Sequence, residues 1–146
     1  MSAPVTAEAI IAAARGWIGT PYLHQASLKG VGCDCLGLLR GVWREVIGDE
    51  PEHPGPYSPY WAEAGREDRL AEAARRHLTE VPVTEARPGD VLLFRWRTGL
   101  PAKHLGIVST PDTIIHAHDG IAVCEVPLGL WRRRIAHAFR FPQGSV

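Results

Sequence analysis

The chain has 146 residues, of which 45% are hydrophobic and 22% are charged, and its 16 Lys and Arg balance its 16 Asp and Glu. This length predicts a single domain over residues 1–146 with one sizeable core. A net charge of zero excludes a generally basic nucleic-acid-binding protein, so no nucleic-acid partner is expected. The one basic run, residues 131–134 (WRRR), is interpreted as a solvated approach to a strand.

The first half of the chain has the pattern of helices. Apolar residues recur at helical spacing over residues 10–18, with Thr6 as the predicted N-cap. A loop with two glycines follows, and a second apolar stripe over residues 36–47 predicts a second helix. Four prolines make residues 49–59 an irregular excursion, after which a third helix is predicted from about residue 60 to residue 78.

The second half has the pattern of β-strands. The predicted strands cover residues 91–96, 105–108, 113–117, 121–126 and 135–141. Turn residues such as Asp119 and Gly120 separate them, and the connections are short enough for antiparallel neighbours. Helices followed by strands predict an α+β fold, in which the N-terminal helices pack on one antiparallel sheet of about five strands.

Cys35 stands at the predicted start of the second helix. Asp34 is well placed as the N-cap, which puts Cys35 in the first helical turn. There the unpaired N–H groups and the helix dipole favour a thiolate, and the same groups can hold an oxyanion. The Asp34 carboxylate opposes the thiolate, and a cysteine in this position is more often a small buried hydrophobe. The glycine-rich loop before the helix favours an accessible thiol.

A thiolate nucleophile needs a base, and histidines gather on two predicted strands. Alternation puts His104 and Gly106 on one face of their strand. It also puts His116 and His118 on one face of the next strand. One pairing register sets His116 opposite His104, and a slip of two residues sets His118 there. Either register brings imidazoles together, as acyl transfer by a cysteine and a histidine requires.

Five short motifs in this order together resemble the NlpC superfamily of bacterial cell-wall cysteine peptidases. They are residues 19–22 (GTPY), 34–38 (DCLGL), 87–91 (RPGDV), 104–108 (HLGIV) and 115–117 (IHA). Each motif is weak alone, and the ordered set is specific. The resemblance covers roughly residues 9–117. Residues 19–43, which include HQAS at 24–27 and GCDC at 32–35, resemble most closely the phage-tail branch of that superfamily.

The resemblance implies a papain-like core whose nucleophile begins a helix and whose histidines lie on the sheet. By position, Cys35 is the nucleophile, His104 the base and His116 the polar residue that orients the base. Tyr22 lines the substrate groove with its hydroxyl near the nucleophile, and Asp34 is assigned with it to substrate binding. Neither a metal nor another cofactor is needed. Members of the superfamily cut short peptides of peptidoglycan, typically next to D-glutamate linked through its γ-carboxyl.

The sequence departs from the superfamily pattern at two positions. The serine that usually follows the nucleophile is Leu36 here, so any polar role of that side chain is missing. Cys33 adds a second thiol two residues before Cys35. Because Cys33 precedes the helix cap and lacks the helix dipole, Cys35 is the preferred nucleophile.

Three alternatives stay open on the sequence alone. A zinc site could use Cys33, Cys35, Cys124 and one of His104, His116 or His118, although the C-x-C spacing is shorter than in structural zinc pairs. The same Cys–His chemistry could serve an amidase or an acyltransferase. The chain could also be a non-catalytic scaffold that keeps the fold for assembly. Cys124 itself is interpreted as a core residue.

The sequence also predicts where the protein is made and how it reaches its substrate. No signal peptide and no apolar run long enough to span a membrane is present, and three thiols without a disulfide pattern suit synthesis in the cytoplasm. A wall peptidase made there needs a carrier. The phage-tail likeness predicts incorporation into a phage tail or tail-like particle, through hub or tip proteins docked on Tyr57, Tyr60 and Trp61.

Overall fold

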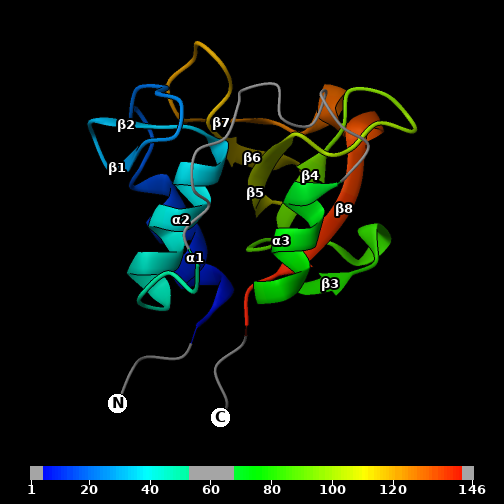
Figure 1. The fold of residues 1–146 in the computed structure, drawn as a ribbon, viewed down its shortest axis with the longest axis horizontal. Coiled ribbons are helices and arrows are strands. Elements are labelled where there is room, and N and C mark those ends of the chain that lie inside the picture. The colour runs from blue at the N-terminus through cyan, green and yellow to red at the C-terminus, as the bar shows by residue number, and fades with distance from the viewer. Residues whose placement is uncertain (1–4, 53–67, 143–146) are drawn as a thin grey trace.

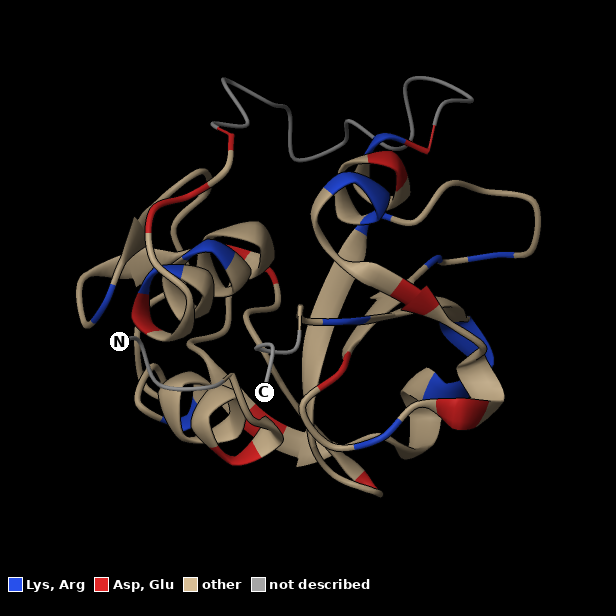
Figure 2. Ribbon diagram, turned by 90° about the horizontal axis from the view of Figure 1, so that it is seen from below, with Lys and Arg blue, Asp and Glu red and all other residues tan. Residues whose placement is uncertain are grey.

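The structure is a computed structural model that describes residues 5–52 and 68–142 (Figure 1). These residues form three α-helices, eight β-strands and two short 3₁₀ helices, one before the fourth strand and one before the eighth. None of the helices described is long and apolar enough to cross a membrane. Figure 2 shows that residues of both charge signs occur along the helices, and α3 (Arg69–His77) contains both.

The helices begin at residues with capping side chains. The Thr6 hydroxyl accepts a hydrogen bond from the Ala9 N–H at 3.1 Å, at the start of α1 (Ala7–Arg15). Asp34 caps α2 (Cys35–Val46) in the same way, so both predicted N-caps are confirmed. Helix α3 begins after Asp68. The first part of the predicted third helix, residues 60–67, lies outside the described residues.

Six strands form the main sheet in the order β3-β8-β4-β5-β6-β7, and every neighbouring pair is antiparallel. Their bounds are β3 Thr79–Val81, β4 Val91–Phe94, β5 His104–Thr110, β6 Thr113–His116, β7 Cys124–Pro127 and β8 Ile135–Arg140. The predicted α+β class and antiparallel sheet are confirmed. Only β4 to β7 form a meander, because β8 returns to lie between β3 and β4.

The structure corrects the predicted strands at several points. Strand β3 was not predicted, because three residues directly after a helix are too few to show alternation. Strand β7 begins at Cys124 rather than at residue 121. The basic run before β8 lies in a 3₁₀ helix, η2 (Gly129–Arg134), and its three arginines are exposed, which agrees with its interpretation as a solvated approach to a strand.

The loop predicted between the first two helices contains a small hairpin. Strands β1 (Ser27–Leu28) and β2 (Gly32–Cys33) pair through a turn at Gly30, whose φ of +78° is in the left-handed region that glycine tolerates. Tyr22 forms an isolated bridge with Cys33 in β2. Strand β2, which leads into α2, is therefore joined both to β1 and to the segment around Tyr22.

Two apolar clusters lie on the two faces of the main sheet. On one face α1 and α2 pack against β5, and Trp17 and Leu38 contribute to a cluster with Leu105 and Ile107 (Figure 1). Gly41 allows this packing, because a Cβ there would lie 1.9 Å from the Trp17 ring. Trp17, which belongs to the apolar stripe over residues 10–18, is 2% exposed and is therefore a core residue.

The second cluster covers the sheet face turned away from α1 and α2. Its buried members are Leu92, Phe94, Val108, Ile114, Leu128 and Ala138. Trp131 from η2 packs against it. Because side chains alternate along a strand, His104 shares this face with Val108, and His116 shares it with Ile114.

Candidate active site

The Asp34 carboxylate organises the start of α2. Its Oδ1 accepts a hydrogen bond from the Gly37 N–H and its Oδ2 one from the Gln25 N–H, both at 2.7 Å. Asp34 is 3% exposed, so both bonds are shielded from water. A Cβ at Gly37 would lie 1.8 Å from the Ala26 carbonyl oxygen, which shows how closely the preceding loop approaches the helix. These contacts hold Cys35 in the first turn of α2.

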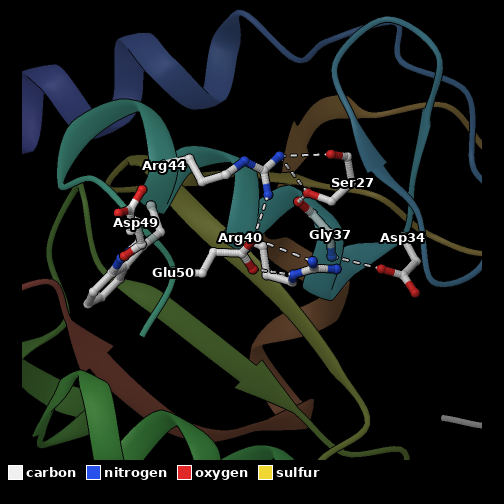
Figure 3. A network of polar contacts seen from close by, with 8 residues as sticks. Ser27, Asp34, Gly37, Arg40, Arg44, Asp49 and Glu50 are labelled. Atoms are coloured by element: carbon white, nitrogen blue, oxygen red, sulfur yellow. Dashed lines mark hydrogen bonds and ion pairs between the residues drawn. The ribbon is translucent and has the colours of Figure 1, made fainter. Parts of the chain in front are cut away.

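A polar network on the outer side of α2 joins the helix to the hairpin (Figure 3). The Ser27 hydroxyl donates to the Gly37 carbonyl oxygen at 2.6 Å, and the Arg44 guanidinium donates to the Ser27 carbonyl oxygen at 2.7 Å. Arg44 and Arg40 both pair with Glu50 beyond the end of the helix. The network therefore fixes the hairpin, the helix and the chain after it as one unit.

Cys35 approaches the main sheet from the helix side. It is half-buried, and the backbone N–H groups of Leu105 and Leu36 donate hydrogen bonds toward its sulfur. Burial raises the pKa of the Cys35 thiol to about 12, and the Asp34 carboxylate adds to the rise. The helix start does not outweigh these two effects, so the thiol is protonated at neutral pH. The contact with Leu105 brings Cys35 to the residue next to His104.

The other two thiols lie in different surroundings. Cys33 is completely buried in β2, and burial together with the Asp34 charge raises its pKa to about 12. Cys124 pairs with His116 across β7 and β6 and is half-buried, so its interpretation as a core residue is wrong. Within residues 5–52 and 68–142, no three His, Cys, Asp or Glu side chains are arranged to hold a metal ion.

His104 and His116 form a hydrogen-bonded pair. The His104 Nε2 and the His116 Nδ1 are 2.9 Å apart, and the two residues are 4% and 3% exposed. Burial lowers the pKa of His104 well below its usual value and that of His116 to about 4, and the neighbouring histidines add to both shifts. Both imidazoles are therefore neutral at pH 7.

The strand register decides between the two arrangements that the sequence left open. Ile107 pairs with Ile115 and Val108 with Ile114, so the same register continues to Gly106 opposite His116. Extended further, it brings His118 and not His116 opposite His104. His116 nevertheless reaches His104 diagonally, and the absent side chain of Gly106 leaves room for this, since a Cβ there would lie 3.3 Å from the His116 Cβ.

Tyr22 lies close enough to Cys35 and Asp34 for their charges to interact. Burial, followed by the negative charges at Cys35 and Asp34, raises the pKa of the Tyr22 hydroxyl. The Asp119 carboxylate acts in the same direction. The Tyr22 hydroxyl is therefore neutral at pH 7, and its place in a substrate groove stays a prediction.

Aromatic rings around the histidine pair were missed by the sequence analysis. The Trp131 ring centroid is 5.2 Å from each of the rings of His104, His116 and His118. The Trp96 ring stacks on His104 with centroids 6.2 Å apart. Trp96 and Trp131 both lie next to arginines in the sequence, but only the fold brings their two segments together.

Comparisons with known proteins agree with this architecture. The family described as Domain of unknown function (DUF6950) matches residues 25–140. The chain belongs to this family. The match includes Cys35, His104 and His116, and therefore every part of the site described above except Tyr22.

One curated protein with a named activity is similar to the chain in sequence. The Gamma-DL-glutamyl hydrolase of Bacillus subtilis (strain 168) is 26% identical over 143 residues, and the match covers 94% of this chain and 30% of that protein. The chain thus spans less than a third of that relative.

Two solved structures show the same fold. The NlpC/p60 domain of the peptidoglycan hydrolase SagA is 25% identical, with a TM-score of 0.65 over 94% of this chain and 100% of that one. An NlpC/P60 family protein from Bacillus cereus ATCC 10987 is 20% identical, with a TM-score of 0.70 over 95% of this chain and 41% of that one. The NlpC/p60 fold that the motifs predicted is confirmed.

Proposed function

We propose that this chain is a cysteine endopeptidase that cuts stem peptides of peptidoglycan next to γ-linked D-glutamate. The observation that carries the proposal is the approach of the Cys35 sulfur to the backbone of Leu105, next to the hydrogen-bonded His104 and His116. The similarity to a gamma-DL-glutamyl hydrolase and to the domain of a peptidoglycan hydrolase supports the bond type and the substrate class.

The proposed reaction starts from a neutral thiol and a neutral imidazole. If the His104 Nε2–H donates to the His116 Nδ1, the His104 Nδ1 has a free lone pair and can act as a base. His104 then takes the Cys35 proton as the sulfur attacks the carbonyl carbon. His116 holds the His104 ring and its tautomer, which is a positioning role.

The tetrahedral intermediate collapses to a thioester. The N–H groups that the start of α2 leaves without helical partners can donate to the oxyanion. The peptide C–N bond breaks, and the amine leaves with the proton held by His104. Water, deprotonated by His104, attacks the Cys35 thioester, which releases the carboxylic acid and restores the thiol.

Digestion of purified peptidoglycan, with mass analysis of the soluble fragments, tests the proposal. We expect fragments that end at γ-D-glutamate, released by the unmodified protein and not by Cys35→Ser. The Cys33→Ser protein is the matched control, because it removes a neighbouring thiol. Fragments produced equally by Cys35→Ser would refute the proposal.

One observation favours a second candidate, a non-catalytic scaffold that binds the wall. Burial and Asp34 hold the Cys35 thiol in its protonated form, which is the less reactive one. A protein that binds peptidoglycan but releases no fragment would be this scaffold. A protein that instead transfers the acyl group to an added amine, with no wall fragment released, would be an amidase or acyltransferase.

We further propose that a phage tail or tail-like particle carries the domain to the wall. The likeness of residues 19–43 to phage-tail peptidases supports this, and the site lies in that segment and on the sheet behind it. The predicted docking residues Tyr57, Tyr60 and Trp61 lie outside the described residues. Fractionation of intact particles should recover the chain with tail-tip proteins. Recovery only from soluble fractions would contradict the proposal.

A further inference from the structure

The Trp131 ring packs against the imidazoles of His104, His116 and His118. It is tilted by 36° against the His104 ring and stands nearly perpendicular to the rings of His116 and His118, at 87° and 84°. Among the aromatic rings of the described residues outside the histidines, no other contacts all three imidazoles, and Trp96 contacts only His104 and His118. Trp131 is half-buried, so it covers the histidines at the edge of the folded part of the site.

Two contacts at the turn between β5 and β6 hold Trp131 in this position. Leu128, which precedes η2, donates its N–H to the Asp112 carbonyl oxygen at 2.7 Å. The Arg132 guanidinium is bound to the Asp112 carboxylate at 2.9 Å. Leu130 is 95% exposed, so η2 turns Leu130 outward and Trp131 toward the sheet. Because this turn joins the two strands that carry the histidine pair, it fixes the indole relative to that pair.

The histidine pair is almost free of solvent, and Trp131 is part of what covers it. The His104 Nε2 and the His116 Nδ1 form their 2.9 Å hydrogen bond at 4% and 3% exposure. Burial is the first cause of the low pKa of both imidazoles. An indole packed on the pair excludes water on that side, which strengthens the hydrogen bond and disfavours an imidazolium. Water admitted there would compete for the ring nitrogens and let the His104 ring turn.

Several titratable or charged groups also lie around the histidine pair. His118 adds to the low pKa of both imidazoles, Asp119 raises the pKa of His118, and Arg134 lowers it. In the described part of the chain, the full set is His118, Asp119, Arg134, Lys103, Cys124 and Cys35. All of them stay in place when Trp131 alone is replaced. A change in the titration of the pair then reports the loss of the indole.

We propose that Trp131 is a positioning residue whose indole closes the hydrogen bond between His104 and His116 off from water. The His104 ring is thereby held in the orientation that accepts the Cys35 proton. This inference rests on the proposed function. Trp131 takes part in no bond change, since the proton moves from Cys35 to His104 and the indole only fixes the ring that receives it. The indole suits this role because it contacts both members of the pair and is itself held through Asp112.

Titration of the imidazoles by NMR, in nitrogen-labelled Cys35→Ser protein, tests the cover without turnover. We expect Trp131→Leu to raise the pKa values of His104 and His116 by about one unit, because water then reaches their hydrogen bond. Trp131→Phe keeps an aromatic ring at this position and should reverse about half of that shift. The dispersion of the amide signals shows whether each variant is folded.

Kinetics of the protein with Cys35 in place test the positioning role. Trp131→Leu should lower kcat by about tenfold and move the acid limb of kcat to higher pH, because the His104 ring is less well held and is protonated more readily. KM should stay within about threefold of the unmodified protein. Loss of a surface that merely binds substrate would instead raise KM and leave kcat unchanged.

Leu130→Ala is the matched control, because Leu130 also lies in η2 but is 95% exposed. It should leave the titration of both imidazoles unchanged. Unchanged pKa values in folded Trp131→Leu, a fall in those values, an equal shift in Leu130→Ala, or an unchanged kcat in Trp131→Leu would each overturn the role of Trp131. If Trp131→Leu raises the pKa values and the unmodified protein releases no peptidoglycan fragment, the cover of the histidine pair stands and the proposed peptidase function fails.

Discussion

The thiol side and the histidine side of the candidate site are built in opposite ways. Around Cys35, backbone hydrogen bonds and the buried Asp34 carboxylate set the structure, and the nearby charges are negative. Around His104, aromatic rings and imidazoles pack together, and the cations of Lys103 and Arg134 lie over the Trp96 ring.

The two environments have one consequence in common. Negative charge and burial raise the pKa of the thiol, whereas burial and neighbouring histidines lower the pKa values of the imidazoles. Each side therefore favours the uncharged form of its own group. The comparison indicates a resting site with a neutral thiol and a neutral imidazole rather than an ion pair, so proton transfer accompanies attack on the substrate.

Removing the sulfur on the thiol side should have the largest effect. Cys35→Ser is expected to lower the rate of stem-peptide release by at least ~10³-fold, because a serine hydroxyl is a far weaker nucleophile in this setting. Cys33→Ser and Cys124→Ser should stay within roughly tenfold of the unmodified protein. A folded Cys33→Ser protein without activity, together with an active Cys35→Ser protein, would reverse the assignment.

Variants of His116 and His118 test which of the two histidines positions His104. His116→Ala should reduce kcat by about 10–10³-fold, by analogy with the loss of other groups that orient a base. His118→Ala should reduce it less, since His116 and not His118 makes the 2.9 Å hydrogen bond to His104. His116→Asn can keep a polar contact to His104 and should recover part of the rate. A larger loss in His118→Ala would show that the diagonal contact is not the functional one.

The depressed pKa values on the histidine side predict a loss of stability in acid. The unfolded chain binds protons at its histidines near pH 6.5, whereas folded His116 resists protonation until about pH 4. Stability is therefore fully present above pH 6.5 and falls by about 3 kcal/mol for this residue as the pH drops to 4. Urea unfolding at a series of pH values measures the slope.

The loss of stability in acid should come from the buried pair His104 and His116 and not from histidines outside the site. His116→Asn should reduce the slope between pH 6.5 and 4, and buried His104 should supply the slope that remains. His77→Asn is the control, because His77 lies at the end of α3 and pairs with Glu52 outside the site. An unmodified protein with the same stability at pH 7 and pH 5 would contradict the neutral buried pair.

The smallest expected effect tests the negative charge on the thiol side. Asp34→Asn removes the second cause of the raised Cys35 pKa and leaves burial, the larger cause, in place. Alkylation of Cys35 by iodoacetamide at pH 8 should become about threefold to tenfold faster, because the thiolate fraction rises as the pKa falls. Asparagine can still cap α2. Slower alkylation in a folded variant would show that Asp34 does not oppose the thiolate.

Features set by neighbours in the chain could be predicted from the sequence. Thr6 and Asp34 were identified as helix caps because a capping hydrogen bond joins residues three apart. The shared face of His104 and Gly106 followed from the alternation of an extended strand. The ordered motifs predicted the papain-like fold through their resemblance to the NlpC superfamily.

Features set by distant segments were decided only by the tertiary structure. Both strand registers kept the histidines on one face, so only the packing of Gly106 against His116 selected the diagonal contact. The pKa of Cys35 depends on burial by the sheet, and no pattern near residue 35 measures it. Trp96 and Trp131 meet because β8 returns beside β4. Hydrogen bonds within a turn are local, whereas burial and charge at a site are sums over segments that only the fold brings together.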